Sequence, residues 1–168
     1  MHKGGFTPFN FEIPKNLVKK KDNFLVVKVD NKRHPQEVPT VNVDWWNYGG
    51  ITRDVKVVIT PDNFIQQYSV QLDPAQDIKK SKAQGRFVVT GSIDLNREAG
   101  EGSVTVKIPE LDFSRDYAVS GSRLEFDLEL ADLELWSPED PKLYNVELTY
   151  NGETLSDRIG FRKIEAVG

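Results

Sequence analysis

The sequence contains no cysteine, and it has only two histidines, His2 and His34. The lack of cysteine excludes disulfides, thiolate zinc sites and cysteine nucleophiles. Two histidines are too few for a histidine-rich metal site, and they argue against a Ser-His-Asp triad. Long apolar runs are missing as well, because no stretch approaches the ~20 residues of a membrane-spanning helix. We therefore expect no metal, no cofactor and no membrane as a partner.

Positive charge is also scarce: 22 Lys and Arg face 26 Asp and Glu, which gives a net charge of -4. This balance disfavours nucleic acid or an anionic membrane surface as a partner. The charge is unevenly distributed, with 10 basic and 6 acidic residues in 1–60 and 12 basic and 20 acidic residues in 61–168. The shift predicts a domain boundary near Pro61.

What the sequence does have is a period-two alternation of apolar and polar residues that recurs along the whole chain. In 124–130, for example, Glu125, Asp127 and Glu129 separate the apolar residues. Because successive side chains of a strand point to opposite faces, one face of this strand is exposed and the other buried. The pattern predicts an all-β protein, and it gives these three carboxylates a structural role in solubility and edge protection.

Turn signals and spacing refine the fold. Asn151-Gly152 matches a type I′ hairpin turn between two strands. The polar run 75–83 has only Ile78 to bury, so it is interpreted as a loop and not as a helix. After Pro61 the strands recur at intervals of about 8–12 residues, as in immunoglobulin-like sandwiches. Residues 1–60 offer only three candidate strands, 9–13, 25–29 and 55–59, which are too few for a sandwich of their own.

Four segments in order carry a resemblance to a known family: 4–13, 43–55, 135–144 and 160–165. The second contains the run Asp44-Trp45-Trp46-Asn47-Tyr48-Gly49-Gly50-Ile51. Together they resemble glycoside hydrolase family 2, in the β-galactosidase and β-glucuronidase branch. In that family a jelly-roll sugar-binding domain precedes an immunoglobulin-like β-sandwich and a catalytic TIM barrel with two glutamates.

The resemblance implies a division of the chain into two parts. Residues 1–60 look like the C-terminal part of the jelly-roll (galactose-binding-like) domain, and 61–168 look like the whole immunoglobulin-like β-sandwich. The alternation begins within a few residues of Met1, so we expect a piece of a longer protein. The piece is expected to be a non-catalytic accessory part of a retaining β-galactosidase or β-glucuronidase, with no catalytic residue of its own.

The candidate substrate-binding residues are Asp44, Trp45 and Trp46. By resemblance, Asp44 lies on a loop that reaches the barrel and accepts hydrogen bonds from the sugar. Trp45 and Trp46 could stack on pyranose rings, but neighbours in an extended segment point opposite ways, so both cannot line one platform. From the residues alone, Asp44 could equally cap a turn. Trp136, followed by Ser137-Pro138, is predicted to seal the sandwich.

The expected partners follow from the same interpretation. Carbohydrate is a ligand only of the full-length enzyme, and the TIM barrel of the parent chain is the main contact. Residues 1–60 have apolar faces without partners, which predicts self-association. Two alternatives remain: a free-standing carbohydrate-binding module, and a β-sandwich protein-interaction domain.

Overall fold

The computed structural model describes residues 1–44, 46 and 48–164. The chain divides into two units, Met1–Val57 and Val58–Gly168, here called unit 1 and unit 2. The described residues of unit 1 contain one short 3-10 helix, η1 (Lys15–Leu17), and no strand. The three strands predicted at 9–13, 25–29 and 55–59 are therefore wrong for this structure. These segments have alternating side chains but no neighbouring strand with which to form a ladder.

Unit 2 contains all the strands of the described chain, so the predicted all-β class is confirmed. The elements, in order, are β1 (Ile65–Leu72), α1 (Ile78–Gln84), β2 (Arg86–Ile108), η2 (Pro109–Leu111), β3 (Phe113–Ala131), β4 (Tyr144–Tyr150) and β5 (Glu153–Ile159). All strand pairs are antiparallel.

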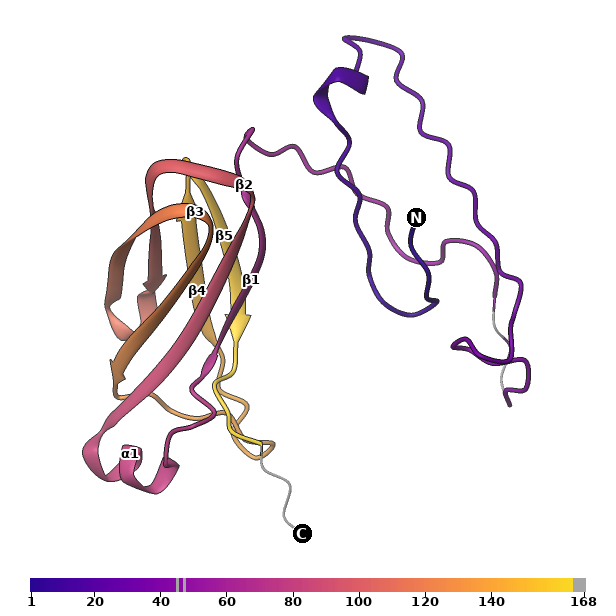
Figure 1. Ribbon diagram of the computed structural model, residues 1–168. Coiled ribbons are helices and arrows are strands. Elements are labelled where there is room, and N and C mark those ends of the chain that lie inside the picture. Colours follow the sequence, from indigo (N-terminus) through magenta and orange to yellow (C-terminus); the bar gives the residue numbers. More distant parts are fainter. Residues whose placement is uncertain (45, 47, 165–168) are drawn as a thin grey trace. The chain divides into compact units, whose positions relative to one another are not determined.

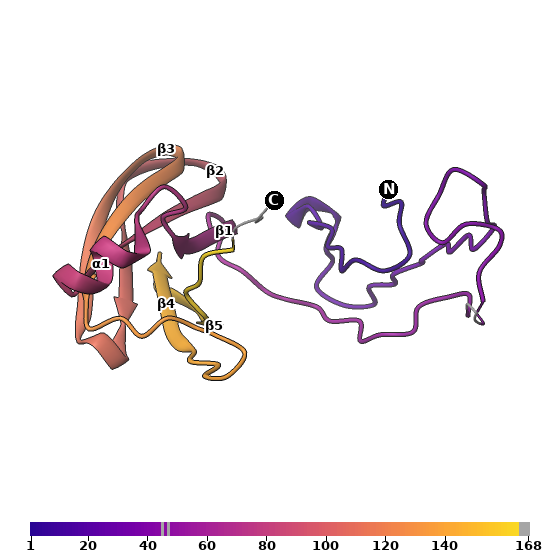
Figure 2. The same cartoon turned by 90° about the horizontal axis from the view of Figure 1, so that it is seen from below.

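Two long strands, β2 and β3, bend and fold the sheet over on itself (Figures 1 and 2). The first arm of β2 pairs with β1 and with the second arm of β3, where Phe87 lies opposite Leu130. Its second arm pairs with the first arm of β3 and with β4, where Val106 lies opposite Leu148. The β2–β3 register shifts between Asp94 and Gly102, at the bend. The bends close one side of a two-layered sandwich.

The core of unit 2 lies between these two layers. Alternate residues of every strand except β5 are buried there, as the period of two predicts. Phe161, after β5, is fully buried, with its ring 5.8 Å from that of Tyr144. The Tyr144 hydroxyl is not left unpaired, because it accepts a hydrogen bond from the Glu134 backbone N–H at 2.9 Å. The core therefore includes residues from the loops on either side of β4 and β5.

Two local predictions have opposite outcomes. The hairpin turn at Asn151-Gly152 is confirmed, with φ values of 48° and 78° between β4 and β5. The loop predicted at 75–83 is wrong, because it contains α1. Capping supports this helix despite its polar composition: the Asp77 carboxylate accepts from the N–H groups of Lys79 and Lys80, and Gly85 ends the helix in the left-handed region. No helix of the described residues has the length and apolar character needed to cross a membrane.

Candidate functional site

The segment around Asp44 is the site that the sequence predicts. Asp44 is exposed, and Trp46 and Tyr48 keep 90% and 84% of their surface exposed. Trp45, the third candidate, lies outside the described residues. An exposed carboxylate and an exposed indole face offer a hydrogen-bond acceptor and a stacking surface to a sugar. The chemistry of binding is therefore available, while desolvation is not.

The carboxylates of unit 2 lie on the surface, where they pair with cations. Glu125, Asp127 and Glu129 are all exposed along the second arm of β3. Arg123 contacts Glu125 at 3.0 Å and Asp94 at 2.9 Å. Its hydrogen bond to Glu125 and the charge of Asp94 raise the Arg123 pKa further above its ordinary value. Such exposed pairs stabilise little, and they do not form a catalytic dyad.

Buried acid chemistry is missing from the part of the chain that the structure describes. Ser81, with 8% of its surface exposed, is the one buried polar residue there. No three His, Asp or Glu side chains among the described residues come together in a way that could hold a metal ion. A retaining glycosidase needs two carboxyl groups about 5–5.5 Å apart in a shaped site. The described residues offer no such pair with either member buried.

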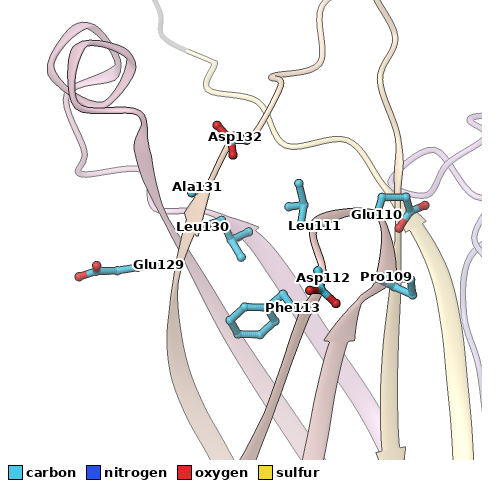
Figure 3. A pocket seen from close by; sticks show the side chains of 9 residues that line it. All are labelled: Pro109, Glu110, Leu111, Asp112, Phe113, Glu129, Leu130, Ala131 and Asp132. Atoms are coloured by element: carbon cyan, nitrogen blue, oxygen red, sulfur yellow. The ribbon is translucent and has the colours of Figure 1, made fainter.

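A hollow of about 430 Å³ lies between η2 and the end of β3 (Figure 3). Leu111, Phe113 and Leu130 give it an apolar lining, while the side chain of Glu129 points away from them. Glu110, which also lines it, accepts a hydrogen bond from the Asn145 N–H at 3.0 Å. Sequence reasoning did not predict this hollow, because its residues come from two distant segments and share no motif.

The corner at Trp136 has the structural role that its prolines predict. Trp136 is partly buried, and its backbone N–H donates to the Phe161 carbonyl at 2.9 Å. Its ring lies against Gly160, where a Cβ would come within 2.8 Å of the indole. The Arg162 guanidinium carbon lies 5.3 Å from the ring centre. This corner ties the loop before β4 to the segment after β5.

The geometry thus describes an accessory β-domain with an exposed aromatic segment, and comparisons with known proteins agree with it. The β-galactosidase of Thermoanaerobacterium thermosulfurigenes is 29% identical, over 96% of this chain and 24% of that protein. The β-glucuronidase of Paenibacillus borealis is 28% identical, over 99% of this chain and 30% of that protein.

A solved structure shows the same relationship. The apo structure of Bacteroides uniformis beta-glucuronidase 3 matches 79% of this chain and 17% of its own, with a TM-score of 0.56 and 27% identity. The chain therefore spans less than a third of each of these relatives. The family model described as Glycosyl hydrolases family 2 matches residues 51–162, most of the chain. The chain belongs to glycosyl hydrolase family 2.

Proposed function

We propose that this chain is a non-catalytic accessory part of a retaining β-galactosidase or β-glucuronidase. The observation that carries the proposal is the placement of its acids. Every Asp and Glu of the described residues lies outside the buried class, on strand faces, turns or loops. The relatives support the same conclusion, because each matches this chain along only a minor part of its own length.

The role of unit 2 is then architectural. Its core is closed by Phe161 and the partly buried Trp136, so it can act as a rigid body between neighbouring parts of the enzyme. Asp44, Trp45 and Trp46 are proposed to contribute to the sugar-binding subsite once a catalytic TIM barrel covers them. Covering would desolvate the Asp44 carboxylate and strengthen its hydrogen bonds to sugar hydroxyls.

The first test of this proposal is enzymatic. The purified chain should not hydrolyse nitrophenyl β-galactoside or β-glucuronide above the buffer rate, because no described carboxylate pair can act as nucleophile and acid/base. Turnover that persists through purification and disappears when one carboxylate of this chain is changed would refute the accessory role.

The second test separates the accessory role from a free-standing carbohydrate-binding module. Calorimetric titration of the chain with galactose and glucuronic acid should show no saturable binding, because Asp44 and Trp46 are solvated. Saturable binding that is lost in Trp46→Ala and kept in the control Phe24→Ala would favour the module. Phe24 is as exposed as Trp46, which makes it a matched control.

A further inference from the structure

The first and last strands of unit 2 meet along a seam that has no backbone ladder. β1 pairs only with β2, and β5 pairs only with β4, within the described residues. Figure 1 shows β1 and β5 beside one another on the side of the sandwich opposite the bends of β2 and β3. The bent strands close one side covalently, so the β1/β5 side needs another means of closure.

Side-chain hydrogen bonds close this side. Asn151 Nδ2 donates to the Asn63 carbonyl at 3.1 Å, the Tyr68 hydroxyl donates to Asp157 Oδ2 at 2.9 Å, and Lys163 Nζ donates to the Gln76 carbonyl at 2.9 Å. The sequence separations are 88, 89 and 87 residues. This nearly constant offset means that the two segments run parallel and in register. We call these six residues the seam.

Both outer contacts of the seam are anchored to the sandwich. Next to Asn63, Phe64 and Asn96 exchange two hydrogen bonds, from Phe64 N to Asn96 Oδ1 at 2.9 Å and from Asn96 N to the Phe64 carbonyl at 3.1 Å. The Gln76 side-chain amide donates to the Val88 carbonyl at 2.7 Å and accepts from its N–H at 3.2 Å, as a neighbouring strand would. The seam thus links fixed points of the β1 side to β5 and the segment after it.

The energetic contrast between the seam and the ladders is large. Separating β1 from β2, or β4 from β5, breaks a ladder that joins seven residue pairs. Separating β1 from β5 breaks three side-chain hydrogen bonds, each contributing about 1 kcal/mol net. β5 also contributes no fully buried side chain, so its movement exposes little apolar surface.

We propose that unit 2 opens locally along this seam, and that the Tyr68–Asp157 hydrogen bond at its centre holds it closed. Opening parts β1 from β5 while β2, β3 and β4 keep their ladders and their core. Because Asn63 precedes the first strand and Lys163 follows the last, the open state lets the segments on either side of the sandwich move independently. The seam is therefore the hinge of this domain.

Native-state hydrogen exchange of the whole chain tests the proposal. The amides of β1 and β5 should exchange as one class, faster than those of β2 and β4. Tyr68→Phe removes one hydroxyl and should speed this class about fivefold, while the slowest amides of β2 and β4 stay within about twofold of wild type. Adding Asp157→Ala to Tyr68→Phe should bring little further change, because the two share one bond.

Tyr117→Phe is the matched control. The Tyr117 hydroxyl donates to the Asp127 carbonyl at 3.1 Å, within β3, so its loss should leave the exchange of β1 and β5 unchanged. Three outcomes would overturn the proposal: β1 and β5 exchange only with the slowest amides, Tyr68→Phe speeds all strands equally, or Tyr117→Phe has the same effect on β1 and β5 as Tyr68→Phe.

Discussion

In unit 2, alternate residues of β2 such as Val89 and Val106 are completely buried, and their neighbours face water. In unit 1, the equally regular run Phe9, Phe11 and Ile13 keeps half or more of each side chain exposed. The two units thus share one sequence pattern and differ in whether a second layer covers it. Alternation predicts which residues share a face, but only a partner strand turns that face into a core.

The difference should be largest in solution. Cutting the chain between Val57 and Val58 should leave a monomeric unit 2, whereas the full chain should self-associate through the exposed apolar residues of 1–60. Light scattering over a range of concentrations measures the difference. Monomers at every concentration for both proteins would show that the exposed side chains of unit 1 do not mediate association.

A core deletion should give the next largest effect. Phe161→Ala should lower the free energy of unfolding by about 3–5 kcal/mol, because Phe161 is fully buried against Tyr144. The same change at Phe11, which is 60% exposed, should cost less than about 0.5 kcal/mol. Urea midpoints of the two variants decide the matter, and equal midpoints would contradict the contrast between the units.

The sequence predicted this contrast only in part. It identified the strands of unit 2 and the Asn151-Gly152 turn because each depends on neighbouring residues or on a simple period. It did not predict α1, because capping by Asp77 and Gly85 outweighs the poor amphipathicity of the segment. It also predicted separate short strands, where the structure has β2 and β3 bending from one layer to the other.

The candidate site shows the same limit. A resemblance of motifs was enough to single out Asp44, Trp45 and Trp46, and the exposure of Asp44 and Trp46 is compatible with binding. Which side chains would face a sugar depends on a covering surface that no local pattern encodes. The hollow beside η2 and the seam between β1 and β5 escaped prediction for a related reason, since both join residues that are far apart in the chain.

A smaller effect is expected where a backbone lies under a ring. Gly160→Ala should cost about 1–3 kcal/mol, because its Cβ would come within 2.8 Å of the Trp136 ring and 3.1 Å of Leu143. Gly100→Ala is the control, since its Cβ would meet nothing within 4 Å. Urea midpoints measure both variants. If the Gly100 variant were destabilised as much as the Gly160 variant, the Trp136 corner would not explain the loss.

The smallest effect should appear at alkaline pH and should sharpen the comparison, because it belongs to unit 2 alone. Burial raises the pKa of Tyr68, and the hydrogen bond to Asp157 and the charge of Asp157 raise it further. Above about pH 10 the unfolded chain therefore loses this phenolic proton while the folded chain keeps it. Since the folded state then binds more protons, stability is complete below that pH and falls as the pH rises through the raised pKa.

Tyr68→Phe should flatten this decline between about pH 9 and pH 11, measured by urea unfolding at each pH. Tyr117→Phe should flatten it less. Burial raises the Tyr117 pKa as well, but the hydrogen bond and charge of Arg115 lower it. Because both tyrosines lie in unit 2, removing unit 1 should leave the decline unchanged. Identical pH profiles for wild type and Tyr68→Phe would mean that the contact with Asp157 does not persist in solution.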